Sequence, residues 1–173
     1  MKTKDLTHIA LMTAILCILA PISIPIPVSS VALTMATFAI YLMAYILKPK
    51  QALASVGIYL FLGAVGLPVF SGYMAGISRF AAPGGGYLIG YLFLAGISSF
   101  SVHRFSRLTM QVLGMLLATL VMYCIGTFWL AYTTGISFTA ALPAGMLVFL
   151  PLDTVKIIFS AYIGRKLQKH IKK

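Results

Sequence analysis

The sequence predicts an all-α membrane protein, a bundle of six transmembrane helices in a single domain spanning residues 1–173. Three observations predict it: an apolar composition, long intervals without charge, and a one-sided distribution of cations. Hydrophobic residues make up 61 % of the chain and charged residues 9 %, against about 25 % charged in a typical soluble protein. So few charges cannot cover a water-exposed surface, which excludes a soluble globule, a disordered chain and a collagen-like fibre.

The uncharged intervals set the number of helices. Asp, Glu, Lys and Arg are absent from residues 6–47, 51–78, 80–103 and 108–152, which are 42, 28, 24 and 45 residues long. A membrane-spanning helix needs roughly 20 apolar residues, so the two longer intervals are predicted to hold two helices each. These runs are continuously apolar and do not alternate, which excludes a transmembrane β-barrel.

Proline and glycine divide the two long intervals. The first is interrupted by Pro21, Pro25 and Pro27, and the last by Gly135 and Pro143. The predicted helices therefore cover residues 7–20, 31–47, 53–67, 87–101, 108–132 and 142–163.

Six crossings place both chain ends on one side of the membrane, and the cations indicate which side. Inside segments are enriched in Lys and Arg, and a cytoplasmic N-terminus puts eleven of the thirteen cations inside. These are Lys2, Lys4, Lys48, Lys50, Arg104, Arg107, Arg165, Lys166, Lys169, Lys172 and Lys173. We interpret them as orientation anchors in contact with the lipid bilayer and not as a nucleic-acid surface, although the C-terminal cations could also contact anionic lipid.

Asp153 and Lys156 break this pattern because they lie in the last predicted helix. A charge at the centre of a bilayer costs roughly 2.5–3.5 kcal/mol on insertion scales, so neither side chain is expected to face lipid. At positions i and i+3 they share one helical face and can both point into the bundle. They predict either a site for a ligand with adjacent N–H and C=O groups, or an ion pair that only fixes helix packing. Pro151 is expected to loosen the backbone beside them.

Arg79 lies in a stretch, residues 68–86, that is expected outside the membrane. The stretch is rich in glycine but too apolar for a solvated loop, so it is predicted to pack back onto the helices as a lid or short helix. Its arginine can either meet the carboxylate of a ligand or face lipid headgroups.

Other chemistry finds little support in the sequence. The three histidines are scattered, which gives no metal site, and no hydrolase motif occurs, so the chain is not expected to be an enzyme or to need a cofactor. No Walker A motif occurs either, so any ATP hydrolysis has to come from another protein. Ala10 and Ala14 form a pair of small residues that allows close approach of another helix, from this chain or from a partner.

Several segments resemble the BioY family, the biotin-binding S components of energy-coupling factor (ECF) transporters. Residues 59–70 read YLFLGAVGLPVF and resemble the family segment YLxLGxxGLPVF. Residues 83–91 read PGGGYLIGY, similar to GPTGGYLIGF, and residues 149–156 read FLPLDTVK, similar to FxPxDxxK. Residues 33–38, LTMATF, are a weaker match to TLQTF, and the resemblance runs from about residue 20 to 165.

The resemblance implies uptake of biotin from outside, in a six-helix bundle that binds it between the helices and the first and third outer loops. It implies that Asp153 and Lys156 hold the ureido ring and that Arg79 holds the valerate carboxylate. The residues implied to line the pocket are Tyr87, Gly85 and Gly86.

The resemblance also implies partners, a transmembrane coupling protein and two ATPases, with docking near Ala10 and Ala14. Two departures from the family pattern remove polar groups: Met35 replaces Gln, and Gly84 replaces Thr. They leave open whether the ligand is biotin or a relative of biotin. Two other functions stay open at this point: a self-sufficient proton-coupled transporter that uses Asp153, and a purely structural membrane subunit.

Overall fold

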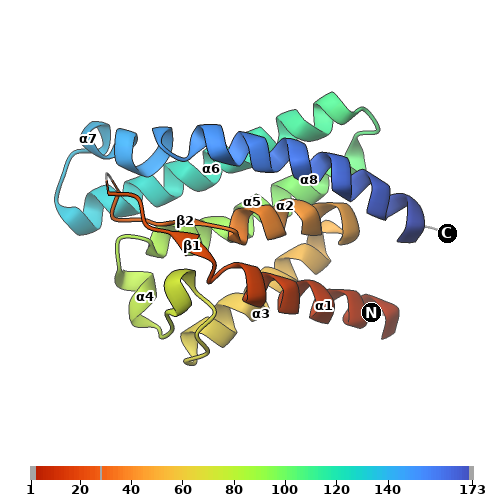
Figure 1. Cartoon of the computed structure of the whole chain (residues 1–173), viewed down its shortest axis with the longest axis horizontal. Coiled ribbons are helices and arrows are strands. Elements are labelled where there is room, and N and C mark those ends of the chain that lie inside the picture. Colours follow the sequence, from red (N-terminus) through yellow and green to blue (C-terminus); the bar gives the residue numbers. More distant parts are fainter. Residues whose placement is uncertain (1–2, 28, 172–173) are drawn as a thin grey trace.

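The computed structural model describes residues 3–27 and 29–171, and the side chains as far as Gln168. Long helices lie side by side along one direction (Figure 1). They are α1 (Thr3–Leu19), α2 (Ala36–Ile46), α3 (Pro49–Ala64), α5 (Gly85–Arg104), α6 (Leu108–Thr134) and α8 (Leu150–Ile171). Each of the six predicted ranges overlaps one of these helices. Lys2, Lys172 and Lys173, predicted as anchors, lie outside the described residues, as does the side chain of Lys169.

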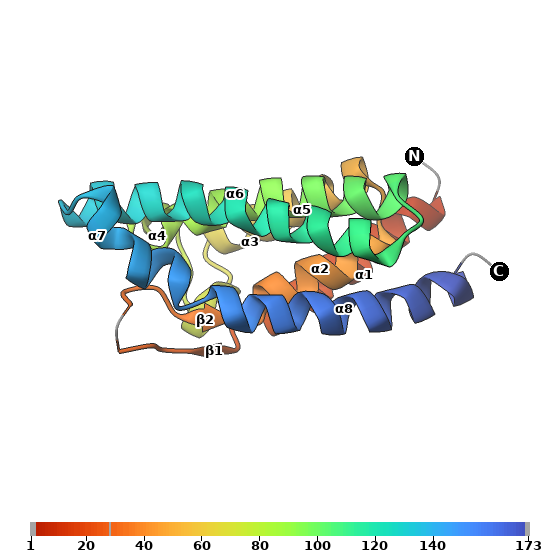
Figure 2. The same ribbon diagram turned by 90° about the horizontal axis from the view of Figure 1, so that it is seen from above.

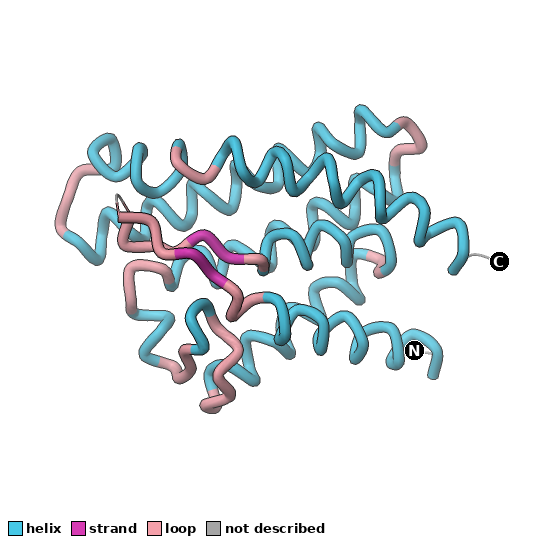
Figure 3. Tube along the Cα trace, viewed as in Figure 1, coloured by secondary structure: helices cyan, strands magenta, loops and turns pink. Residues whose placement is uncertain are grey.

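Short elements gather at the opposite end from the N-terminal end of α1 and the C-terminal end of α8 (Figures 1 and 3). They are β1 (Ser23–Ile24), β2 (Leu33–Thr34), a 3₁₀ turn η1 (Ser71–Tyr73), α4 (Ser78–Ala81), α7 (Phe138–Leu142) and a π-helical stretch η2 (Pro143–Leu147). The prediction that residues 68–86 pack back as a short helix is confirmed, since η1 and α4 both lie in that stretch.

Helical segments in the described part of the chain are long and apolar enough to cross a membrane. Three qualify: Gly85–Arg104, Leu108–Thr134 and the combined segment Phe138–Gln168, while Ala36–Ile46 is apolar but shorter. The chain is therefore a mostly helical membrane protein. The N-terminal end of α1 and the C-terminal end of α8 lie at the same end of the bundle, where an even number of crossings would place them (Figure 1). The number of crossings and the cytoplasmic position of the termini stay predictions.

The second helix begins later than predicted, at Ala36 and not at residue 31. The preceding residues form a β-hairpin, in which Ser23 pairs with Thr34 and Ile24 with Leu33. The hydroxyl of Thr34 accepts a hydrogen bond from the backbone N–H of Ala36 at 3.1 Å, a local bond that competes with continued helix. Hydropathy alone did not separate this apolar hairpin from the helix that follows it.

The third helix begins earlier than predicted, at Pro49 and not at residue 53. Proline suits the first turn of a helix because its missing N–H would have no partner there. The side-chain oxygen of Gln51 also accepts the backbone N–H of Lys48 at 2.9 Å and so satisfies a free donor at the helix start. A charge near a membrane helix therefore marks the edge of the apolar interval but not the end of the helix.

Helices α5 and α6 lie against each other along most of their length (Figure 2). Glycine makes this approach possible: a Cβ atom added at Gly126 would lie 2.3 Å from Cδ1 of Tyr87, and one at Gly90 would lie 2.8 Å from Cγ of Met122. The close contact buries Tyr87 between the helices, at the end of the bundle where the short elements gather.

Candidate ligand-binding site

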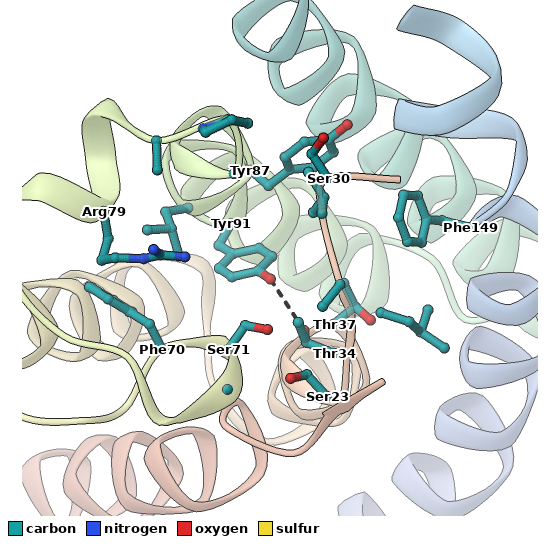
Figure 4. A pocket seen from close by; sticks show the side chains of 18 of the residues that line it. Ser23, Ser30, Thr34, Thr37, Phe70, Ser71, Arg79, Tyr87, Tyr91 and Phe149 are labelled. Carbon is teal, nitrogen blue, oxygen red and sulfur yellow. Dashed lines mark hydrogen bonds between the residues drawn. The ribbon is translucent and has the colours of Figure 1, made fainter. Parts of the chain in front are cut away.

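A cavity of about 520 Å³ opens among β1, β2, η1 and α4, the adjoining ends of α2, α5 and α8, and the middle of α6 (Figure 4). This volume falls within the range of small-molecule sites. Four of the residues predicted from the sequence line this one cavity: Asp153, Lys156, Arg79 and Tyr87. The structure thus brings together residues that are up to 77 positions apart in the chain, a separation given by Arg79 and Lys156.

Asp153 and Lys156 form an ion pair that faces the bundle interior. Nζ of Lys156 lies 2.8 Å from Oδ1 of Asp153, and the two side chains are 13 % and 4 % exposed. The prediction that both charges point away from lipid is confirmed.

Two hydroxyl groups complete the surroundings of this pair. The hydroxyl of Tyr123, from α6, donates to Oδ2 of Asp153 at 2.5 Å, and the hydroxyl of Thr37, from α2, donates to Oδ1 at 2.9 Å. Lys156 also donates to the hydroxyl of Thr37 at 3.0 Å and to the backbone carbonyl of Thr34 at 2.7 Å. Sequence reasoning missed Thr37 and Tyr123 as site residues, since both lie within uncharged helices.

Arg79 occupies another part of the cavity wall. It is half-buried on α4, and Figure 4 shows its guanidinium pointing towards the side of the cavity where Tyr91 lies. Phe70 packs edge-on against Phe80 of α4, with ring centroids 5.8 Å apart, and this contact holds α4 in place. The Arg79 guanidinium forms no hydrogen bond or ion pair with residues 3–27 or 29–168, so its donors are available to a ligand.

Tyr87 lines the cavity at the start of α5. Its hydroxyl donates to the backbone carbonyl of Gly145 at 2.7 Å. That carbonyl belongs to the π-helical stretch η2, where the N–H of Val148 bonds to the carbonyl of Pro143, five residues earlier. The sequence predicts a loosened backbone at Pro151, but Pro151 lies within α8. The irregular backbone is at η2, one to two helical turns earlier in the chain.

The glycines before Tyr87 divide into two groups. Gly84 lines the cavity, whereas Gly85 and Gly86, also predicted to line it, do not belong to its wall. A Cβ atom at Gly85 would lie 1.9 Å from the carbonyl oxygen of Phe80, and one at Gly86 would lie 2.3 Å from Cβ of Trp129. These two glycines therefore allow close packing of α5 on α4 and α6.

The walls between the charged groups are mostly apolar or aromatic. Phe70 and Phe149 line the cavity, and the ring of Tyr123 packs against Phe149 with centroids 6.4 Å apart. The hydroxyls of Tyr91 and Thr34 lie 3.4 Å apart across the cavity wall (Figure 4). A ligand with a polar head, an apolar middle and an anionic tail fits this distribution. Metal binding finds no support here, since no group of three His, Cys, Asp or Glu side chains forms within the described residues.

Comparison with known proteins places the chain in a family. The family model described as "BioY family" matches residues 1–173. The chain belongs to the BioY family. The resemblance of its motifs to BioY, predicted from the sequence, is confirmed.

Similar BioY proteins match over nearly the whole chain. The chain is 36 % identical to the "Probable biotin transporter BioY" of Pyrococcus horikoshii, over 97 % of this chain and 98 % of the relative. It is 34 % identical to the "Biotin transporter BioY2" of Lactococcus lactis subsp. cremoris, over 94 % of this chain and 89 % of the relative. A solved structure, titled as the S-component for biotin from an ECF-type ABC transporter, superposes with a TM-score of 0.90 at 31 % identity, covering 98 % of this chain and 95 % of that one. These relatives are named as transporters and not as enzymes.

The two departures from the BioY pattern lie in different places. Gly84 is part of the cavity wall, so the missing Thr hydroxyl removes a polar group there. Met35 precedes α2 and is not part of the wall, so the missing Gln does not change the polarity of the lining.

Proposed function

We propose that this chain is the biotin-binding S component of an ECF transporter, which captures biotin from outside and delivers it inward. One observation carries this proposal. The same cavity is lined by the buried ion pair of Asp153 and Lys156 and, separately, by Arg79, which has no polar partner among the described residues. Membership of the BioY family and the names of its relatives support the choice of biotin over other ligands.

In this proposal the two ends of the ligand meet different groups. A carboxylate accepts hydrogen bonds and an ammonium donates them, so Asp153 accepts a ureido N–H while Lys156 exchanges one of its three hydrogen bonds within the protein for one to the ureido oxygen. Arg79 donates to the valerate carboxylate, where two parallel hydrogen bonds are possible. Each hydrogen bond to a charged group contributes about 1.5–3 kcal/mol.

Energy for transport would come from the partner proteins, a transmembrane coupling protein and two ATPases. The sequence has no Walker A motif, which supports an external source of ATP hydrolysis. Ala10 and Ala14 are both exposed on α1, which supports docking of a partner helix on that face. We propose that the chain works in the cell membrane, with six crossings and both termini in the cytoplasm.

Equilibrium binding of labelled biotin to the purified chain tests the proposal. We expect saturable binding that Asp153→Asn and Lys156→Ala each weaken more than they reduce the yield of folded protein. Absence of binding at micromolar biotin would overturn the proposal. A collapse in yield, with full binding by the protein that remains, would make the ion pair structural.

Transport assays separate this function from a proton-coupled carrier. In the proposed function the energy for uptake comes from ATP hydrolysis by the partner proteins, and Asp153 is engaged in hydrogen bonds with Thr37, Tyr123 and Lys156. We therefore expect uptake in cells to persist when the proton gradient is collapsed while ATP is held constant. Uptake that stops under this treatment would favour the carrier.

A further inference from the structure

We propose that Tyr123 and Thr37 are positioning residues, which fix the carboxylate of Asp153 so that it accepts one N–H group from the ligand. The inference rests on the proposed function, because it concerns how the same cavity recognises a ureido group. It assigns a role to two hydroxyl groups that the binding scheme above does not use.

The acceptor positions of Asp153 can be counted. An ionised carboxylate has about four lone-pair positions, two on each oxygen. Oδ1 accepts from Thr37 at 2.9 Å and from Lys156 at 2.8 Å, which fills both of its positions. Oδ2 accepts from Tyr123 at 2.5 Å, which leaves one position on an oxygen of a residue that lines the cavity.

The direction of the hydrogen bonds around Asp153 is also determined. Thr37 has one hydroxyl proton, which it donates to Asp153, and its oxygen accepts from Lys156. The three N–H groups of Lys156 reach Asp153, Thr37 and the Thr34 carbonyl. Every donor near the carboxylate therefore already points at an acceptor, and the remaining position on Oδ2 is suited to a donor from the ligand.

The positioning groups are held firmly. Tyr123 is 2 % exposed and Thr37 is 6 % exposed, and they come from α6 and α2 while Asp153 comes from α8. Three helices thus fix one carboxylate. Preorganised groups of this kind contribute to binding because their orientation is established before the ligand arrives.

A consequence for specificity follows from the single open position. The group that meets Asp153 has to be a hydrogen-bond donor, such as a ureido N–H, since a group with only lone pairs would face the lone pairs of a carboxylate oxygen. Methylation of the ureido nitrogens removes the donor and should weaken binding strongly. The strength of that discrimination depends on how well Tyr123 keeps Oδ2 in place.

Tyr41 offers a matched control. It is a tyrosine with 0 % exposure on α2, and its hydroxyl bonds to the hydroxyl of Thr119 at 2.6 Å, not to Asp153. Tyr41→Phe and Tyr123→Phe each remove one buried hydroxyl and one side-chain hydrogen bond. Tyr123→Phe should lower the melting temperature more, because its partner is a charged carboxylate and that of Tyr41 is a neutral hydroxyl. Only Tyr123→Phe should change recognition of the ureido group.

The experiment measures dissociation constants of biotin and of ureido-N-methylated biotin, by displacement of labelled biotin from the full purified chain. We expect Tyr123→Phe to weaken biotin binding about tenfold and to shrink the penalty for methylation by a similar factor. Tyr41→Phe should leave both quantities within about twofold of the wild type, the ordinary size of an indirect effect. Thr37→Val should behave like Tyr123→Phe, and Thr37→Ser, which keeps the hydroxyl, should restore binding.

Three results would overturn the inference. They are an unchanged biotin affinity in Tyr123→Phe, an equal loss of affinity in Tyr41→Phe, and a methylation penalty in Tyr123→Phe that equals the wild-type penalty. A wild-type chain that binds no biotin would overturn the proposed function instead, and with it the positioning role of Tyr123 and Thr37. The two failures are therefore distinguishable in one set of measurements.

Discussion

Replacing Arg79 with alanine should weaken biotin binding through the carboxylate alone. The guanidinium lines the cavity and has no hydrogen bond or ion pair with residues 3–27 or 29–168, so its removal breaks no polar contact described within the protein. A hydrogen bond to a charged group contributes about 1.5–3 kcal/mol, which corresponds to a loss of about 10- to 150-fold in affinity. Because the side chain is half-buried and solvent screens its charge, the lower part of this range is expected.

The assay compares biotin with biotin amide, which keeps the ureido ring and lacks the negative charge. Arg79→Ala should reduce the affinity for biotin strongly and leave that for the amide within about twofold, the usual size of an indirect effect. Arg79→Lys keeps the charge but loses the planar fork, so its effect on biotin should be intermediate. The melting temperature without ligand should stay near the wild-type value. Equal losses of affinity for both ligands would refute the carboxylate role.

Two further predictions concern the packing around Arg79. Gly85→Ala should lower the melting temperature and yield, since its Cβ would lie 1.9 Å from the carbonyl oxygen of Phe80 and overpacking typically costs about 1–3 kcal/mol. Gly57→Ala is the control, because a Cβ atom there would meet nothing within 4 Å beyond its own helix backbone. Equal melting temperatures for the two variants would contradict the packing argument. Trp129→Phe removes the hydrogen bond from Nε1 to the carbonyl of Ala82 at 3.1 Å, beside the Arg79 helix, and should weaken biotin binding about two- to tenfold. An unchanged dissociation constant would show that this tether is not needed.

Much of the helical arrangement was predictable because a membrane allows few alternatives. Within lipid the backbone has to satisfy its own hydrogen bonds, so long uncharged intervals correspond to helices. The errors lie where this constraint weakens. The hairpin before Ala36 is as apolar as a helix, yet it satisfies its backbone by strand pairing and by the hydroxyl of Thr34. At Pro49 the helix extends past Lys50, because a charge at the membrane boundary does not prevent helical hydrogen bonding.

The charged part of the site was predictable for a related reason. Asp153 and Lys156 stand out because a charge within an apolar helix is costly, and Arg79 stands out as the lone cation of residues 68–86. Tyr123 and Thr37 carry no such cost, and they lie 30 and 116 residues from Asp153 in the sequence. Their contacts depend on how α2, α6 and α8 are rotated against one another, which an uncharged sequence does not specify.

The glycines before Tyr87 illustrate a different difficulty. A glycine permits close approach of a ligand or of a neighbouring helix, and the residue type does not distinguish the two. Gly84 lies on the cavity, whereas Gly85 and Gly86 lie where α5 meets α4 and α6. Only the three-dimensional arrangement separates these roles.

The two charged ends of the cavity are held in different ways, which bears on how a ligand enters. Asp153 is fixed by donors from three helices, and Lys156 connects it to the hairpin through the carbonyl of Thr34. Arg79 stands on a helix of four residues, and Gly76 just before it has a φ of 98°, a turn conformation that favours glycine. In the proposed function, the end at Asp153 would meet the ureido ring, whose donors and acceptor have fixed directions, and Arg79 would meet the carboxylate at the end of the flexible valerate chain. A ligand held at both ends would then contact Lys156, which bonds to the hairpin at Thr34, and Arg79 on α4.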